Sequence, residues 1–183
     1  MKIFLVGFMG AGKTTIGRRL ANRLGYEFYD TDLFFEDKYH FTIQRFFDQF
    51  GEDKFRELEK EVLHELINLA NKAIISTGGG TPCFFDNMEV MNNHGLTVYI
   101  MMKYGALRHR LLHSKKRRPG VQQLNETELM KYIEQLMKFR EEYYKKAHIS
   151  IVGENCNVTE LSEMIQKTIE SISDFPGEQP GQQ

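Results

Sequence analysis

The 183-residue sequence has only two cysteines, almost no net charge and no long apolar run, and each shortage argues against a class of protein. Cys83 and Cys156 are too few for a disulfide-rich scaffold and lack metal-ligand spacing, so we expect a reduced, cytoplasmic compartment. The formal net charge of −1 argues against a dominant nucleic-acid or membrane surface. No run approaches the roughly 18 to 20 apolar residues that span a bilayer. We also expect no signal peptide, because Met1-Lys2 leads straight into an apolar strand.

Short apolar runs alternate with helical patterns along the chain, which is typical of a parallel sheet covered on both faces. Strands are expected at residues 3–6, 26–29, 73–76, 96–101 and 148–152. Helices are expected at residues 15–24, at 33–69 with breaks near His40-Phe41 and at Gly51, and at 85–93, 104–112, 126–146 and 159–172. This order predicts an α/β fold of three layers, α/β/α, with a five-stranded parallel sheet. It forms one domain over residues 1–172, followed by a disordered tail at 173–183.

One segment near the amino terminus fits the phosphate-binding pattern G-x-x-x-x-G-K-[ST]. The segment Gly7-Phe8-Met9-Gly10-Ala11-Gly12-Lys13-Thr14 follows an expected strand and precedes an expected helix, as such a loop requires. The glycines let backbone N–H groups point inward at a polyphosphate, and the helix start adds partial positive charge. Lys13 would reach the β- and γ-phosphates, and the Thr14 hydroxyl would bind Mg²⁺. A glycine-rich turn that matches by chance is the alternative.

Two carboxylates follow the second expected strand. Asp30 and Asp32 lie two residues apart, so one or both can face the phosphate loop at the edge where parallel strands end. Metal-assisted phosphoryl transfer needs one carboxylate to hold Mg²⁺, usually through water, and another near the acceptor hydroxyl. Alternatively, Asp32 is the N-cap of the next helix. The preceding phosphate loop favours the catalytic reading.

Three glycines and two arginines bear on the nature of the acceptor. Gly78-Gly79-Gly80 would be entropically wasteful in a plain connection and suits close approach of backbone to a ligand, with a simple tight turn as the alternative. Arg56 and Arg140 lie on expected helices, and a planar guanidinium suits a carboxylate or phosphate. For each arginine, a solvated side chain paired with a nearby glutamate is the alternative. The residues alone therefore indicate a kinase of a small acceptor, and converging arginines would make that acceptor anionic.

Six segments, in this order, resemble the shikimate kinase family. They are the phosphate loop, Asp30-Thr31-Asp32, Phe55-Arg56-Glu57-Leu58-Glu59, Thr77-Gly78-Gly79-Gly80, Arg118-Pro119, and Arg140 followed by Tyr144. Many enzymes share the loop, but its combination with D-x-D, F-R-x-x-E and G-G-G is specific. The resemblance covers residues 1 to about 172 and implies ATP-dependent phosphorylation of the 3-hydroxyl of shikimate, on the route to the aromatic amino acids.

For the nucleotide, the resemblance implies ATP contacts from Gly10, Ala11, Gly12, Lys13, Thr14, Thr15, Arg110 and Arg118. In such enzymes the arginine matching Arg118 belongs to a lid, here at about residues 112–125, which closes over the phosphates. The arginine matching Arg110 stacks on adenine, with a plain surface arginine as the alternative. Lys13 and Arg118 would thus be catalytic, and Mg²⁺ would be held by Thr14 and, through water, by Asp30.

For the acceptor, the resemblance implies an insertion at about residues 32–60 that contributes to the shikimate site. Asp32 would be the catalytic base and bind the acceptor hydroxyls, and Arg56 and Arg140 would hold the carboxylate. Glu59 would orient Arg56. The backbone of Gly78, Gly79 and Gly80 would line the same pocket. We expect a monomer whose partners are ATP and shikimate, without nucleic acid or membrane.

The sequence departs from the family pattern at several positions. Gly120-Val121 stands where two leucines usually follow Arg118-Pro119, and the proline usual shortly after Arg140 is missing. Glu141-Glu142 places negative charge near the expected acceptor carboxylate, which would either weaken binding or point outward. Residues 153–156 lack the basic side chains that often frame adenine. The phenylalanines of the insertion are expected to form its own core, with one or two lining the acceptor site.

Other readings share part of this pattern. Gluconate kinase or a nucleoside monophosphate kinase would share the loop, sheet and lid, but gluconate kinase is not expected to carry F-R-x-x-E together with the triple glycine. A GTP switch is disfavoured because no N-K-x-D segment is present. An inactive binding protein would be expected to have lost Lys13, Asp32 or Arg118, and all three are present.

Overall fold

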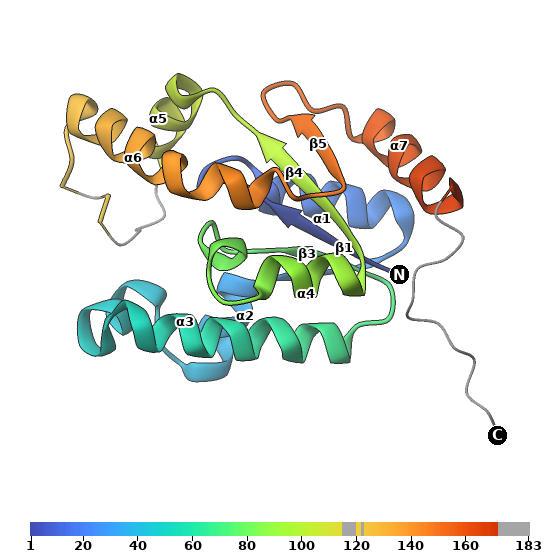
Figure 1. The fold of residues 1–183 in the computed structure, drawn as a ribbon, viewed down its shortest axis with the longest axis horizontal. Helices are drawn as coiled ribbons and strands as arrows, with labels where there is room; N and C mark the ends of the chain where they lie inside the picture. The colour runs from blue at the N-terminus through green and yellow to red at the C-terminus, as the bar shows by residue number, and fades with distance from the viewer. Residues whose placement is uncertain (115–119, 122, 172–183) are drawn as a thin grey trace.

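The computed structural model describes residues 1–114, 120–121 and 123–171. The chain forms a five-stranded sheet with helices between the strands (Figure 1). The strands are β1 (Lys2–Val6), β2 (Glu27–Asp30), β3 (Ala73–Ser76), β4 (Leu96–Met101) and β5 (Ile149–Val152). The helices are α1 (Lys13–Leu24), α2 (Thr31–Tyr39), α3 (Ile43–Leu69), α4 (Asn87–His94), α5 (Tyr104–Leu112), α6 (Glu126–Tyr144) and α7 (Val158–Ser171), with a 3₁₀ turn η1 (Thr81–Cys83) before α4.

The sheet has the strand order β2-β3-β1-β4-β5, and every neighbouring pair is parallel. The connection from β1 to β2 runs toward one edge of the sheet, and the connections that follow β2, β3 and β4 run toward the other edge. Because such crossovers are right-handed, α1 lies on one face of the sheet and the helices that follow β2, β3 and β4 lie on the other. Helix α7 packs against α1, and α3 packs against both α2 and α4. Figure 1 shows α2 and α3 side by side, away from β5 and α7. These contacts confirm the predicted α/β fold.

The core lies on both sides of β1 and β3. Residues Ile3 to Val6 of the central strand have no solvent exposure, as expected for a parallel strand covered on both faces. The expected strand at 26–29 lies one residue later, because the Tyr26 N–H still bonds to Ala21 at the end of α1 and Asp30 pairs in register with Ser76. The expected strand at 148–152 starts one residue later, because the His148 N–H donates to the Thr97 hydroxyl.

The predicted breaks in the 33–69 region are confirmed. His40 adopts a left-handed conformation after α2, and Gly51 interrupts α3 with φ 79° and ψ 176°. The helix expected at 85–93 begins instead at Asn87, because Phe84 is extended and Phe85 has φ 52°. The turn η1 was not expected.

Aromatic side chains form the core between α2 and α3, as predicted for the insertion. Phe35 is buried at the centre and packs against Tyr39, Phe46 and Phe55. Phe50 remains 46% exposed at the edge of this cluster. Offset and edge-on ring pairs of this kind fix the direction of α3 relative to α2. Arg56, on the next turn of α3 after the kink, is therefore held on a rigid support.

The carboxyl ends of the strands meet at one edge of the sheet. The phosphate loop follows β1 there, Asp30 ends β2, Thr77 follows β3, and Gly153 follows β5. In the described part of the chain, no helix has both the length and the apolar character needed to cross a membrane.

Asp30 links the second strand to the helix that carries Asp32. The Asp30 side chain accepts hydrogen bonds from the backbone N–H groups of Asp32 and Leu33, at 3.1 and 3.4 Å, and is the N-cap of α2. Its second oxygen accepts from the Thr14 hydroxyl at 2.7 Å. The alternative in which Asp32 caps the helix is therefore wrong, because the cap lies two residues earlier. Asp32 is left as a first-turn residue of α2.

This cap predicts a difference between two substitutions of Asp30. Asp30→Ala should lower the free energy of unfolding by about 1 to 2 kcal/mol, because alanine cannot accept from the first turn of α2. Asp30→Asn should lose much less, because asparagine caps a helix as well as aspartate does. Urea denaturation monitored by circular dichroism measures both. Equal losses in the two variants would contradict the capping role.

Candidate active site

The phosphate loop wraps around the side chain of Lys13. Gly10 and Gly12 have φ of 82° and 101°, a region that side chains with a Cβ rarely adopt, so both positions require glycine. The buried Lys13 ammonium donates to the carbonyls of Gly7 and Phe8, at 2.6 and 2.9 Å. Helix α1 starts at Lys13, so its first N–H groups open toward the loop. This geometry is the polyphosphate cradle that the motif predicts.

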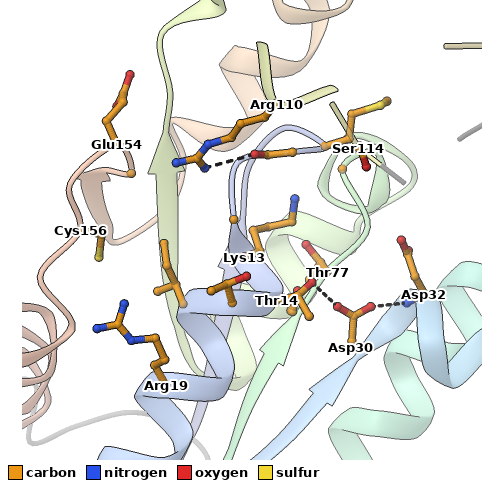
Figure 2. Close-up of a pocket in the computed structure, with 18 of the residues that line it drawn as sticks. Lys13, Thr14, Arg19, Asp30, Asp32, Thr77, Arg110, Ser114, Glu154 and Cys156 are labelled. Atoms are coloured by element: carbon orange, nitrogen blue, oxygen red, sulfur yellow. Dashed lines mark hydrogen bonds between the residues drawn. The ribbon is translucent and has the colours of Figure 1, made fainter. Parts of the chain in front are cut away.

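Thr14 and Asp30 place a hydroxyl and a carboxylate beside this cradle. Their side chains are joined by a hydrogen bond of 2.7 Å, and Figure 2 shows the pair beneath the loop with Asp32 next to it. Hydroxyl and carboxylate oxygens are the donors that Mg²⁺ accepts. Among the described residues no group of three or more His, Cys, Asp or Glu side chains is placed to bind a metal. The pair therefore fits a metal that is also held by phosphate and water.

A cavity of about 560 Å³ lies over the phosphate loop. Of the residues predicted to bind ATP, it is lined by Gly10, Gly12, Lys13, Thr14, Thr15 and Arg110. Ala11, within the loop, is fully buried and is not among the residues that line the cavity. Its N–H donates to the Phe8 carbonyl, and its own carbonyl accepts from the Arg110 guanidinium. Arg118, like the rest of 115–119, lies outside the described residues, as does the tail at 173–183.

Arg110 lies at the rim of this cavity, on α5. Its guanidinium donates to the carbonyls of Ala11 and Gly10, at 3.0 and 3.3 Å (Figure 2). A Cβ on Gly12 would lie 3.2 Å from the same guanidinium. Residues 153–156 and Arg19 also line this cavity, and the sequence did not single them out as nucleotide contacts. Glu154 is one of the residues at 153–156 where the family often has basic side chains. Its carboxylate accepts from the backbone N–H of Lys103 at 2.8 Å.

A second cavity, of about 500 Å³, is lined by both predicted arginines. Arg56 on α3 and Arg140 on α6 are each 7% exposed and come from helices far apart in sequence. The predicted convergence of two guanidinium groups is therefore confirmed. The alternative is wrong in that neither arginine is solvent-exposed, but Arg56 is paired with Glu52 and Glu59, as that alternative expected.

Two glutamates hold the edges of the Arg56 guanidinium. Glu59 accepts from Nη1 at 2.7 Å, and Glu52 accepts from Nε and Nη2 at 3.1 and 2.8 Å. Burial raises the pKa of Glu59, and the Arg56 charge and the Thr81 hydroxyl oppose that rise. Although burial acts against it, the charge of Glu59 raises the pKa of Arg56, which keeps the guanidinium charged. Glu59 thus orients Arg56, in the way that the family resemblance implies.

The triple glycine is required by the side chains around it. None of Gly78, Gly79 and Gly80 has a positive φ. A Cβ on Gly80 would lie 2.6 Å from the terminal nitrogens of Arg56, and one on Gly78 would lie 2.7 Å from Glu59. A Cβ on Gly79 would lie 2.9 Å from the Met9 nitrogen. The backbone of the triple glycine therefore approaches other atoms closely, as expected, but those atoms belong to the protein and not to a ligand.

Arg140 is buried with donors that lack partners. Its Nε and Nη1 atoms have no hydrogen-bond partner among the described residues. Its guanidinium lies 5.7 Å from the centre of the Phe8 ring. Buried polar groups are almost always paired, and an unpaired one carries a substantial desolvation cost. An arginine in this state is a site for an anion.

Glu141 and Glu142, which follow Arg140, line neither cavity. Glu141 pairs with Lys145 at 3.3 Å, and Glu142 is exposed. Tyr144 is fully buried, and its hydroxyl donates to the Gly79 carbonyl. Glu141 and Glu142 therefore add no negative charge to the cavity lined by Arg56 and Arg140, which we call the acceptor cavity. Gly120, another departure, lines this cavity next to Tyr132.

The two cavities share one wall. Met9, Asp32 and Gly79 line both, so Asp32 lies between the phosphate loop and the two arginines. A Cβ on Gly78 would lie 3.0 Å from an Asp32 carboxylate oxygen, which places this carboxylate against the triple glycine. A group bound between the arginines can thus meet a nucleotide phosphate beside Asp32.

Several aromatic residues that line the acceptor cavity were not predicted from the sequence. Phe84, Phe139 and Tyr132 line it, together with Phe47 and Phe55 from the insertion. The F-R-x-x-E motif pointed to Phe55, and the insertion cluster allowed for Phe47. The aromatic pair Phe84-Phe85 shortly after the triple glycine is the feature of the sequence that could have indicated an aromatic wall here.

The comparisons with known proteins agree with this geometry. The family model described as shikimate kinase matches residues 9–173. A shikimate kinase from Phocaeicola vulgatus is 42% identical over 172 residues, covering 93% of this chain and 95% of the relative. Two solved structures carry the same fold over at least 93% of this chain. Shikimate kinase from Bacteroides thetaiotaomicron has 38% identity, 98% coverage and a TM-score of 0.85. The enzyme from Acinetobacter baumannii, in complex with shikimate, has 36% identity, 94% coverage and a TM-score of 0.81.

The family model spans nearly the whole described fold, and it includes the loop residues from Met9 onward, Asp32, Arg56, the triple glycine and Arg140. The relatives match over almost their whole lengths at identities well above the level at which only a fold is shared. The chain belongs to the shikimate kinase family.

Proposed function

We propose that this protein is a kinase that transfers the γ-phosphoryl group of ATP to the 3-hydroxyl of shikimate, giving shikimate 3-phosphate and ADP. One observation carries the proposal: the phosphate-loop cavity and the cavity with two buried arginines meet at Asp32. Family membership supports shikimate as the acceptor and gives no support to gluconate. The enzyme from Acinetobacter baumannii, which has shikimate bound, has the same fold.

The nucleotide is bound by the phosphate loop and the start of α1. Backbone N–H groups of Gly10, Gly12 and Thr14 bind phosphate oxygens, and the Lys13 ammonium exchanges its loop carbonyls for the β- and γ-phosphates. Charge stabilisation and positioning provide most of the rate enhancement in this class of reaction. Arg110, which lines this cavity, is proposed to stack on adenine, as the family resemblance implies. Arg118 contributes from the lid at about residues 112–125, in the part of it that lies outside the described residues.

The acceptor is held by charge and oriented by backbone. Arg56 and Arg140 bind the shikimate carboxylate, and the unpaired donors of Arg140 are a buried site for that anion. Gly78, Gly79 and Gly80 line the cavity beside the ring. Bound in this way, the acceptor has its hydroxyls toward Asp32, which accepts the proton of the attacking 3-hydroxyl.

Thr14 and Asp30 are the protein groups that fit Mg²⁺, Asp30 through water. Such an ion, when bound, neutralises charge on the β- and γ-phosphates. The Asp30 carboxylate has a second task, because the same side chain caps α2 and so fixes the position of Asp32. We further propose that one domain spans residues 1–172, that its insertion at 32–60 carries the acceptor groups, and that the protein acts as a monomer.

A coupled assay of ADP release tests the proposed function. The purified protein with ATP and Mg²⁺ is offered shikimate, gluconate and a panel of nucleoside monophosphates in parallel. Turnover with shikimate far above the others is expected, and mass spectrometry should identify shikimate 3-phosphate. Turnover that prefers gluconate or a nucleotide, or none with shikimate, would overturn the proposal.

Replacing Asp32 tests its role as the base. Asp32→Asn should lower kcat by about 10² to 10⁴, because the amide cannot accept the proton in the transition state. The variant keeps the shape of the side chain, so we expect the dissociation constant of ATP, measured by calorimetry, to stay near the wild-type value. Near-normal turnover would rule out this role.

Replacing Arg140 separates acceptor binding from folding. Arg140→Met removes the charge but keeps a long buried chain, and the KM for shikimate should rise by about 10- to 100-fold through loss of charge-assisted hydrogen bonds. Stability without ligand should be unchanged or higher, because two buried nitrogen donors, Nε and Nη1, that have no partner among the described residues are removed. The two measurements are steady-state kinetics and urea denaturation. Unfolding of the variant, or an unchanged shikimate KM, would contradict the anion-site assignment.

A further inference from the structure

We propose that Phe84 is a positioning residue that sets acceptor affinity by covering the face of the Arg56 guanidinium, and that Phe139 supports it from α6. The inference deepens the proposed function and rests on it. Phe84 lies just after the η1 turn and Phe139 next to Arg140, so the aromatic pair joins the segment that contacts Arg56 to the helix that carries Arg140. Neither residue belongs to a motif that the sequence resemblance used.

The guanidinium of Arg56 lies close to the Phe84 ring. Its central carbon is 4.2 Å from the Phe84 ring centre, compared with 5.1 Å for Phe55 and 5.9 Å for Phe47. A cation this close to a ring face is attracted by the negative charge of the π system, and more strongly when both are desolvated. Arg56 is 7% exposed and Phe84 is half-buried, so this contact is largely shielded from water.

The edges of Arg56 are already held by other groups. Glu59 and Glu52 accept from three of its nitrogens, which fixes the direction of the guanidinium plane along its edges. These bonds do not prevent the plane from tilting or water from reaching its face. Phe84 lies against the guanidinium and restricts that tilt, so the N–H groups of Nη1 and Nη2 that do not bond to a glutamate are presented to the cavity at a fixed angle. Binding to a carboxylate benefits when its partner is already oriented.

The backbone before Phe84 is held in place at several points. The Thr81 hydroxyl donates to Glu59 at 2.6 Å, the Asn87 amide donates to the Thr81 carbonyl at 2.9 Å, and the Cys83 N–H donates to Gly80 at 2.8 Å. Directly after it, Phe85 has a positive φ of 52°, which a residue with a side chain rarely adopts. Glu59 therefore binds both Arg56 and the turn that carries Phe84.

Phe139 completes this arrangement from the opposite wall. Its ring meets Phe84 edge-on, with centres 6.5 Å apart, and also packs against Tyr143 on the next turn of α6. Phe139 is 46% exposed, so burial alone does not explain an aromatic residue at this position. Its contact with Phe84 does, because edge-on pairs restrain each other's orientation.

The cavity boundaries predict which kinetic constant depends on Phe84. Phe84 and Phe139 line the acceptor cavity and are absent from the wall of the nucleotide cavity. Loss of the ring should therefore weaken shikimate binding and leave ATP binding intact. Chemistry at saturating shikimate should change little, because Phe84 lines only the acceptor cavity, whereas Lys13 lines the nucleotide cavity.

Steady-state kinetics of Phe84→Leu test the inference, with Phe85→Leu as the matched control. Leucine keeps an apolar side chain but removes the π face, so the KM for shikimate should rise by about 3- to 30-fold, the range for loss of a desolvated cation–π contact. The values of kcat and of the ATP KM should stay within about twofold of wild type. Phe85→Leu changes an adjacent, exposed ring that does not cover Arg56, and should leave all three constants unchanged.

Rescue by another aromatic residue makes the test independent of folding. The sequence contains no tryptophan, so Phe84→Trp introduces a single indole above Arg56. Indole is the best cation–π partner, so this variant should keep a shikimate KM near wild type. Its emission should change on titration with shikimate and not with gluconate. A folding defect in Phe84→Leu would appear in urea denaturation and lower kcat without raising the shikimate KM.

The outcomes separate this inference from the proposed function. If wild-type protein does not phosphorylate shikimate, the proposed function fails, and the inference fails with it. If wild type is active and Phe84→Leu keeps the wild-type shikimate KM, the inference alone is overturned. A rise in KM in both Phe84→Leu and Phe84→Trp would show a requirement for phenylalanine shape, and would also overturn it.

Discussion

The burial of two positive charges in one cavity is the constraint on which the rest of the site depends. Arg56 and Arg140 are removed from water, and within residues 1–114, 120–121 and 123–171 no ion pair is found for Arg140; a buried charge costs several kcal/mol unless other groups compensate it. Glu59 and Glu52 compensate Arg56, and aromatic faces shield both guanidinium groups. The remaining positive potential is available to an anionic acceptor. We therefore attribute the proposed preference for a carboxylate to buried positive charge that the described residues do not fully neutralise.

The same constraint explains features that look unrelated in sequence. Gly80 has no Cβ because the Arg56 nitrogens occupy that volume, and Gly78 has none because Glu59 does. Thr81 supplies the second hydrogen bond to Glu59, and Tyr144 fixes the carbonyl of Gly79 from α6. Each of these residues packs against or hydrogen-bonds to Arg56, Glu59 or the triple glycine. Packing at native density leaves no room to alter one of them alone.

Sequence reasoning predicted the parts of the site that follow directly from strand order. The phosphate loop, Asp30, Asp32 and the triple glycine each follow a strand, and parallel strands bring those ends together. It could not assign the helix cap, because Asp30 and Asp32 are equally good caps and only register against β3 shows that Asp30 ends the strand. It also missed the η1 turn and Phe84, because a three-residue turn has no periodicity to detect.

The roles of Asp30 and Asp32 differ because of one backbone detail. A helix that begins directly after a strand needs a cap at the strand's last residue, and that residue here faces the phosphate loop. One oxygen of Asp30 is therefore committed to α2, while the other binds the Thr14 hydroxyl. Asp32 is two residues further on, in the first turn of the helix, and borders both cavities. The D-x-D spacing thus separates a carboxylate fixed beside the nucleotide from one that can reach the acceptor.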